Sequence, residues 1–146
     1  GYIEEAFLGY KTERYNIKGK DVVAGNCKYY LNDLSFKNFL YPSFAYGVGY
    51  LLENAVYLEL RRLGYIVYTG SFRDKEVDFV AMKDDRVSYL QATYMLETAQ
   101  TMEREYAPLL TIGDNYEKYV VSMDEVQFPS NEGVRHIQAW NLKEIL

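Results

Sequence analysis

Polar side chains occur at alternate positions in two neighbouring strand-like segments of the sequence. Glu76 and Asp78 lie in the first segment, and Gln91 and Thr93 lie in the second. If the two segments form a hairpin that turns at 84–85, Gln91 lies opposite Asp78 and Thr93 lies opposite Glu76 on one face of the sheet. Directly opposed residues have Cβ atoms about 4.5–5.5 Å apart. These four side chains are therefore expected to form a polar group that needs partners, a metal ion or a pocket.

A further acidic residue, Glu53, is expected to join this group from a helix. Val56 and Leu60 follow it at i+3 and i+7, so Glu53 shares their apolar stripe and its carboxylate should point toward the sheet. A buried carboxylate is costly unless it is paired or neutralised. The oxygens of Glu53, Asp78 and Gln91 could together bind one hard divalent cation such as Mg²⁺. The alternative is that Glu53 forms a local cap or salt bridge and Asp78 lies at a strand edge.

The elements that must position these residues follow the order helix, three strands, helix, strands. The longest helical pattern covers 47–63, with Arg61 and Arg62 in its last turn and Gly64 just past its end. Pro108 is expected to kink or shorten a later helix. We expect an α/β fold with a mixed sheet flanked by helices: strands at 65–70, 76–82, 87–95, 117–123 and 136–140, a helix at about 98–112, and a last short helix capped by Asn141 with Glu144.

The first 40 residues predict three further elements. Apolar spacing favours a short amphipathic helix at 2–10, and strand-like segments on either side of Lys18-Gly19-Lys20 predict a hairpin. A second helix is expected at 28–40, with Asn32 or Asp33 as its cap. A short helix followed by a hairpin is typical of the end of a winged-helix unit. The alternative is a hairpin that packs directly on the main domain.

Composition and charge limit the classes of function. Of the 146 residues 49% are hydrophobic, which is enough for one packed domain, and Cys27 is the only cysteine, so a reducing cytoplasm fits best. No apolar run approaches the roughly 20 residues that span a bilayer, and no signal peptide is visible. Because the sequence starts at Gly1 without a methionine, we expect a fragment of a longer protein.

The charges are distributed unevenly along the chain. Residues 1–73 hold 9 basic and 7 acidic side chains, giving +2, and residues 74–146 hold 7 and 14, giving −7, which together make the net charge of −5. A negative total argues against general affinity for nucleic acid. Any surface that contacts phosphate is therefore expected in the first half.

Five segments together resemble a known family: LLENAVYLELRRLGY, KEVDFVA, YLQATY, TMEREYAPL and NYEKYVV. They resemble the uncharacterised C-terminal domain that follows the ATPase module in many bacterial and archaeal AAA-type ATPases. The resemblance covers essentially the whole chain and implies a PD-(D/E)xK restriction-endonuclease-like fold. It also implies that residues 1–30 are the end of a winged-helix linker and that 31–146 form the nuclease-like domain. The partner implied is the N-terminal, ATP-binding module of the same full-length protein.

The resemblance implies roles for four site residues. Glu53 matches the acid on the helix, and Asp78 matches the acid on the second strand. Gln91 and Thr93 stand where an intact nuclease carries a glutamate and a lysine. Losing that lysine removes the charge that orients water and stabilises the transition state. The site is therefore expected to be degenerate, with Mg²⁺ as the candidate cofactor.

A cation from elsewhere in the chain could replace the missing lysine. Arg104 and Lys118 are the candidates, although pairing of Arg104 with a neighbouring acid on its own helix is the simpler interpretation. His136 and Cys27 have no partners at catalytic spacing, so we expect His136 to serve packing and Cys27 not to be a nucleophile.

Three functions compete. The leading hypothesis is a nuclease-like domain with little or no catalysis, which binds DNA, RNA or a partner protein for its ATPase. The second is an active Mg²⁺-dependent nuclease with a relocated lysine or arginine. The third is a module that binds only protein.

Overall fold

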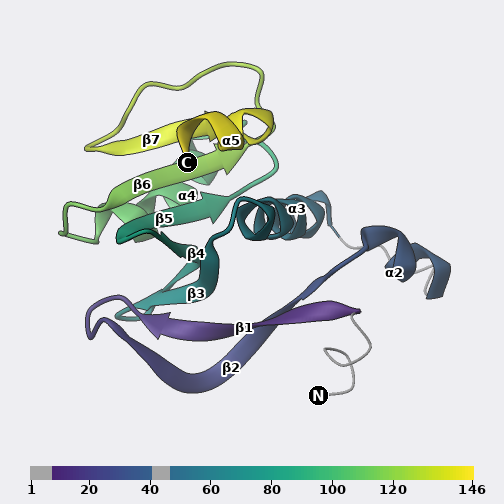
Figure 1. Ribbon diagram of the computed structural model, residues 1–146. Coiled ribbons are helices and arrows are strands. Elements are labelled where there is room, and N and C mark those ends of the chain that lie inside the picture. The colour runs from purple at the N-terminus through teal and green to yellow at the C-terminus, as the bar shows by residue number, and fades with distance from the viewer. Residues whose placement is uncertain (1–7, 41–46) are drawn as a thin grey trace.

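The computed structural model describes residues 8–40 and 47–146, and these form a seven-stranded mixed sheet with helices on both faces (Figure 1). This confirms the expected α/β class. In the described residues, no helix has the length and apolar character needed to cross a membrane. The elements are β1 (Gly9–Asn16), β2 (Asp21–Leu31), α2 (Leu34–Leu40), α3 (Val48–Arg62), β3 (Ile66–Phe72), β4 (Lys75–Lys83), β5 (Arg86–Ala92), α4 (Ala99–Leu110), β6 (Glu117–Ser122), β7 (Val134–Gln138), a 3-10 turn (Ala139–Asn141) and α5 (Leu142–Ile145).

The strands lie in the order β2-β1-β3-β4-β5-β6-β7. Three neighbouring pairs are antiparallel, namely β1–β2, β3–β4 and β4–β5, and the other three are parallel. A parallel pair requires a crossover. Helix α4 makes the crossover from β5 to β6, and the segment that includes α2 and α3 connects β2 to β3 and returns the chain beside β1.

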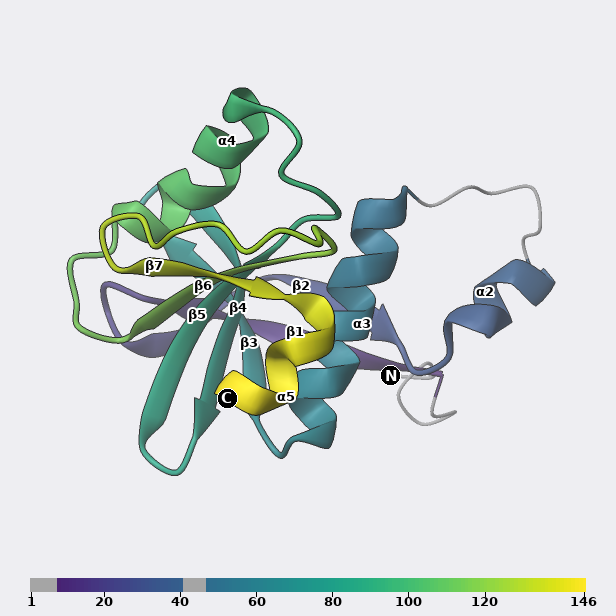
Figure 2. The ribbon, with the colours of Figure 1, turned by 90° about the horizontal axis from the view of Figure 1, so that it is seen from above.

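The two faces of the sheet are covered by different helices (Figure 2). Helices α3 and α5 pack on one face over a core that includes Leu60, Phe79 and Leu142. Helix α4 packs on the other face over a core that includes Val80 and Leu109. Helix α2 lies to one side, away from both layers.

Helix α3 forms and ends as its sequence predicts. Its apolar stripe is buried, with Leu60 fully inaccessible. At its C-terminus the Gly64 N–H donates to the Arg61 carbonyl, and the Tyr65 N–H donates to the Leu60 carbonyl. This is a Schellman arrangement, which requires a left-handed residue just past the helix, and Gly64 has φ +89°.

The β4–β5 hairpin adopts the predicted register along most of its length. Asp84 and Asp85 both have positive φ, as a two-residue turn requires. The pairs Met82–Val87 and Val80–Tyr89 form as expected, but the ladder ends at Phe79–Leu90. Beyond that pair the strands separate. The Thr93 N–H donates to the Val121 carbonyl, so the expected pair between Thr93 and Glu76 does not form.

A β-bulge in β4 changes which face Asp78 uses. Between the pairs Tyr68–Val80 and Gly70–Val77, β4 contains one residue more than β3. Val77 and Val80 consequently both pack on the α4 side, and Phe79 packs on the α3 side. The regular register expected for this hairpin would place Asp78 on the same face as Val80. That expectation was wrong, because the extra residue interrupts the strict alternation of a regular strand.

Gly70 makes this bulge sterically possible. A Cβ atom placed there would lie 2.9 Å from a methyl carbon of Val80 and 3.0 Å from the Cβ atom of Val77. Contacts that short do not occur without displacement of the neighbours, so a glycine is needed where β3 passes the bulge.

The N-terminal region differs from its prediction in two places. Of the helix expected at 2–10, residues 2–7 lie outside the described residues, and Gly9 and Tyr10 belong to β1. Of the helix expected at 28–40, residues 28–31 belong to β2, because pairing with β1 and burial of Tyr30 outweigh local helical spacing. Helix α2 starts at Leu34, and the Asp33 carboxylate accepts the Ser35 N–H at 2.8 Å, as a cap should.

The β1–β2 hairpin turns at 18–20 as expected and is continuous with the main sheet, since β1 pairs with β3. Its earlier assignment to a winged-helix unit stays a prediction. The hairpin ladder has a gap: Thr12 pairs with Lys28 and Arg14 pairs with Val23, so residues 24–27 of β2 bow outward opposite a single residue of β1 (Figure 1).

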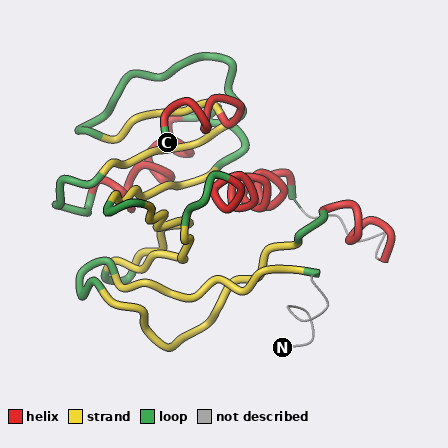
Figure 3. The backbone as a smooth tube through the Cα atoms, in the orientation of Figure 1, coloured by secondary structure: helices red, strands yellow, loops and turns green. Residues whose placement is uncertain are grey.

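The C-terminal part matches its prediction in outline. Helix α4 runs through Pro108 and ends two residues later, close to the expected end at about 112. The last helix lacks the predicted side-chain cap, and the Asn141 amide donates to the Gln138 side chain at 3.0 Å. A long loop joins β6 to β7 and runs along the outside of the sheet (Figure 3).

Candidate functional site

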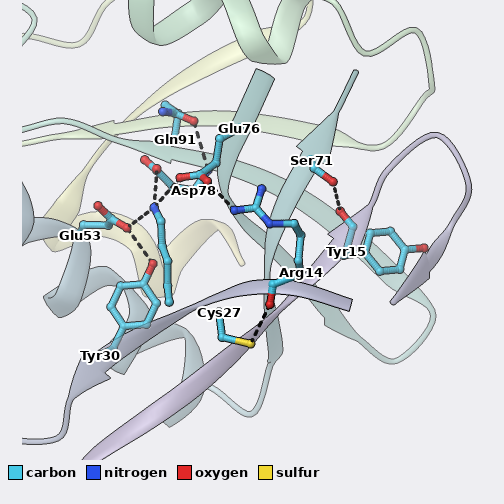
Figure 4. A network of polar contacts seen from close by, with 11 residues as sticks. Arg14, Tyr15, Cys27, Tyr30, Glu53, Ser71, Glu76, Asp78 and Gln91 are labelled. Carbon is cyan, nitrogen blue, oxygen red and sulfur yellow. Dashed lines mark hydrogen bonds and ion pairs between the residues drawn. The ribbon is translucent and has the colours of Figure 1, made fainter. Parts of the chain in front are cut away.

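Three carboxylates from α3 and β4 surround a single ammonium group from β2. The Lys28 Nζ lies 2.9 Å from the Glu53 carboxylate, 2.8 Å from that of Glu76 and 3.5 Å from that of Asp78. Figure 4 shows Glu53, Glu76 and Asp78 pointing toward one another. We call Lys28, Glu53, Glu76 and Asp78 the Lys28 cluster. The predicted convergence of Glu53 with Asp78 is thus present, with an unpredicted cation between them.

Helix α3 holds both the cluster and the strand that supplies the lysine. Glu53 accepts the Tyr30 hydroxyl at 2.7 Å, and its side chain is 17% exposed. The next residue, Asn54, is fully buried and clamps β2 by accepting the Leu31 N–H at 2.8 Å and donating to the Leu31 carbonyl at 2.9 Å. The orientation predicted for Glu53, toward the sheet, is therefore confirmed.

The bulge in β4 positions Asp78 against two backbones and the lysine. One carboxylate oxygen accepts the Ala92 N–H at 2.9 Å, and the other faces Lys28. The Gln91 side-chain oxygen accepts the Asp78 N–H at 3.2 Å. The expected pair between Asp78 and Gln91 therefore does not form, since the ladder ends one pair earlier. The Gln91 oxygen bonds to the Asp78 backbone instead of facing the ammonium, so the predicted convergence of Gln91 with Glu53 and Asp78 was wrong.

Glu76 connects the cluster to a second cation. It binds Lys28 with one carboxylate oxygen and Arg14 of β1 with the other, the latter at 2.9 Å. Its side chain is 41% exposed, so this side of the cluster is open to solvent. The cluster therefore has a buried end at Asp78 and an accessible end at Glu76.

The other predicted site residues have different neighbours. Thr93 is buried beside β6, and none of the described interactions joins it to the cluster. Arg104 bonds to Glu105 at 2.7 Å with its side chain 70% exposed. Lys118 donates to the carbonyls of Asp114 and Tyr116 at 2.6 and 3.1 Å. In the part of the chain that the structure describes, neither Arg104 nor Lys118 bonds to the three carboxylates.

Lys28 is the functional candidate that sequence reasoning missed. The segment that holds it was interpreted as a helix, which hid the alternation that places Lys28 and Tyr30 on one face of a strand. That alternation was visible in the sequence. The approach of β2 to α3 was not, since it depends on contacts between residues more than 20 positions apart.

The electrostatics of the cluster follow from burial and from an excess of carboxylates. Burial, together with the Glu53 carboxylate, raises the pKa of Asp78 to about 7, against the opposing effect of Lys28. Burial alone would lower the pKa of Lys28, but the carboxylates of Asp78, Glu76 and Glu53 outweigh it and raise that pKa. Burial would raise the pKa of Glu76, but Lys28 and Arg14 lower it. The buried end of the cluster therefore retains a proton more readily than the accessible end.

The donor set of the cluster suits a hard divalent cation, whose preferred ligands are carboxylate oxygens at about 2.0–2.6 Å. However, the ammonium of Lys28 lies where such an ion would sit and acts as a stand-in for it. As they stand, no three His, Cys, Asp or Glu side chains among the described residues are arranged to hold a metal ion. The three carboxylates are the residue types that a divalent cation prefers, but their positions are those of an ion pair with Lys28.

A second buried polar network lies near β7 and is saturated with hydrogen bonds. The His136 Nδ1 accepts the Phe128 N–H at 3.2 Å, so its Nε2–H donates to the Ser122 hydroxyl at 2.8 Å, which donates to Asp124 at 2.6 Å. We call Ser122, Asp124 and His136 the His136 network. The aspartate contacts the serine and not the histidine, so this is no catalytic triad. The prediction that His136 serves packing is confirmed.

Comparison with known proteins finds a relative of unassigned function. The chain is 36% identical over 120 residues to a protein of Haemophilus influenzae described as "Uncharacterized protein". The aligned part makes up 82% of this chain but only 29% of that protein, so the same segment occurs within a much longer chain. No family model and no solved structure matches this chain.

Proposed function

We propose that this chain is a restriction-endonuclease-like domain that serves a AAA-type ATPase in the same full-length protein and has little or no nuclease activity. It binds nucleic acid, or a partner protein, on behalf of the ATPase. The observation that carries the proposal is the Lys28 ammonium at 2.8–3.5 Å from the three carboxylates. A nuclease needs a metal ion at that place to polarise the phosphate and activate water.

Three further observations support the proposal. Glu53 and Asp78 converge from a helix and a strand, as the resemblance implies. The residues at the two remaining positions, Gln91 and Thr93, offer neither a carboxylate nor a positive charge. The longer Haemophilus relative is consistent with a domain that works inside a larger protein.

The direct test is metal-dependent cleavage of single- and double-stranded DNA and RNA, with Asp78→Ala as the control. We expect no cleavage in Mg²⁺ or Mn²⁺ above that of the control. Cleavage by the wild type that Asp78→Ala abolishes would overturn the proposal. Binding to the same nucleic acids over a series of salt concentrations then separates the two kinds of partner, because only phosphate contacts give a steep dependence on salt.

A second candidate, an active nuclease with a relocated lysine, is favoured by the position of Lys28 itself. Its ammonium is 3.5 Å from Asp78, close enough to act on a water molecule or phosphate held there. This function requires that Lys28→Ala and Asp78→Ala both lose cleavage. A wild type that does not cut in either metal excludes it.

A further inference from the structure

We infer that Lys28 is a built-in counter-ion that excludes divalent metal from the cluster, so that occupancy by the lysine and occupancy by a metal ion are mutually exclusive. The inference deepens the proposed function, on which it rests, by stating why the site does not bind metal. It also assigns a role to the β1–β2 hairpin, which delivers the lysine.

The first step in the argument is the position of the ammonium. Its nitrogen is within 3.5 Å of oxygens from all three carboxylates, two of which come from β4 and one from α3. A metal ion bound by the same oxygens, once they closed in to about 2.0–2.6 Å, would occupy nearly the same point. Two cations that close repel each other strongly in a half-buried setting, so both cannot stay.

The second step is the charge balance. Lys28 and Arg14 together oppose three carboxylates, and Arg14 contacts only Glu76, at the accessible end. Without Lys28 the buried end would keep Glu53 and Asp78 with no positive partner. Two carboxylates left in that condition attract a divalent cation, because burying them unpaired is costly.

The third step is that the lysine is placed by the fold and is still able to leave. Tyr30 and Leu31 are anchored to α3, and on the other side of Lys28 the ladder gap leaves residues 24–27 unpaired with β1. The Lys28 side chain is 29% exposed, so its flexible stem can move the ammonium into solvent. The anchored strand therefore places the ammonium in the cluster, and the exposed part of the side chain gives it a route out.

The test is calorimetric titration with Mn²⁺ of the wild type, Lys28→Met and Lys28→Arg. We expect Lys28→Met, which keeps the length and apolar stem but removes the charge, to bind Mn²⁺ about tenfold more tightly or better than the wild type. Lys28→Arg keeps the charge and should bind as weakly as the wild type. The double variant that combines Lys28→Met with Asp78→Asn should bind Mn²⁺ no more tightly than the wild type.

The matched control is Lys11→Met, which removes an exposed lysine from the same hairpin outside the cluster. It should leave Mn²⁺ binding unchanged. Equal Mn²⁺ affinity in the wild type and in folded Lys28→Met would overturn the inference. If Lys28→Met does not fold, Lys28→Gln takes its place, since its amide can still donate to Glu53, and equal Mn²⁺ affinity would again overturn the inference. Folding of either variant only when Mn²⁺ is added would support the inference. Failure of both to fold with or without Mn²⁺ would refute it.

The outcomes separate this inference from the proposed function. A wild type that cleaves nucleic acid, together with a tighter metal site in Lys28→Met, overturns the non-catalytic proposal and leaves Lys28 as a competitor that the metal can displace. A wild type that does not cleave, together with unchanged metal affinity in Lys28→Met, leaves the proposal standing and removes the counter-ion.

Discussion

The His136 network and the Lys28 cluster both hold buried polar side chains, and they differ in how their polar groups are compensated. The His136 network gives its hydroxyl, ring nitrogens and carboxylate hydrogen-bond partners inside the fold. The Lys28 cluster instead gathers like charges around one ammonium, with part of Glu76 open to solvent. Hydrogen-bond partners for every buried polar group, as in the His136 network, are the usual condition for a stable fold. The Lys28 cluster retains charge at a cost, which is more typical of a site shaped by function.

The largest expected effect comes from breaking the His136 network. Asp124→Ala removes the acceptor of the Leu96 N–H at 2.8 Å and of the Ser122 hydroxyl, leaving two buried donors without partners. We expect a loss of about 3 kcal/mol in the free energy of unfolding, measured by urea denaturation. The neighbouring exposed Glu125→Ala should change it by less than about 0.5 kcal/mol. Equal effects of the two substitutions would show that the network does not stabilise the fold.

An intermediate effect on the free energy of unfolding is expected when the pH is lowered. Burial lowers the pKa of His136 below its ordinary 6.5, so the folded protein favours the neutral ring. The stability that this ring contributes is therefore complete above pH 6.5 and is lost as the pH falls through the lowered value. Protonation of Nδ1 would also break its bond from the Phe128 N–H.

The measurement is the free energy of unfolding of wild type and His136→Asn between about pH 5 and 8. The wild type should be more stable than the variant at pH 8, and the difference should shrink toward pH 5. If the free energies of unfolding of the two proteins differ by the same amount at every pH, protonation of His136 is not linked to folding.

The smallest effect is expected in the Lys28 cluster. Asp78→Asn keeps an oxygen for the Ala92 N–H and removes the repulsion from Glu53, while it loses the attraction to Lys28. These changes oppose one another, so the free energy of unfolding at pH 7 should change by less than about 1 kcal/mol. If Asp78→Asn lowered the free energy of unfolding as much as Asp124→Ala, the Lys28 cluster would stabilise the fold as the His136 network does, and the difference between the two would disappear.

The features that the sequence predicted are those with local causes. Helix α3 and its end at Gly64 follow from spacing and a glycine, and the β4–β5 register follows from a two-residue turn. The convergence of Glu53 with Asp78 was also predicted, but it does not follow from these features. The regular register would place Asp78 on the α4 side with Val80, and only the bulge in β4 turns it toward Glu53.

The features that escaped prediction depend on contacts distant in the sequence. The bulge that turns Asp78 requires β3 and Gly70 beside β4, and the delivery of Lys28 requires β1 to pair with β3 and Asn54 to clamp β2. None of these contacts has a local signature. The cationic half of the site was therefore assigned to Arg104 or Lys118, which lie on other elements.

The gap in the β1–β2 ladder has a consequence for the solubility of the protein. Strand β2 is an edge of the sheet, and a long flat edge offers unpaired backbone groups on which a second molecule can add a strand. Residues 24–27 interrupt the ladder with β1, so only short regular stretches of that edge remain. At the opposite edge, the loop after β6 covers β7, and the Gln127 amide donates a hydrogen bond to the His136 carbonyl. Neither border of the sheet is therefore a ready template for aggregation.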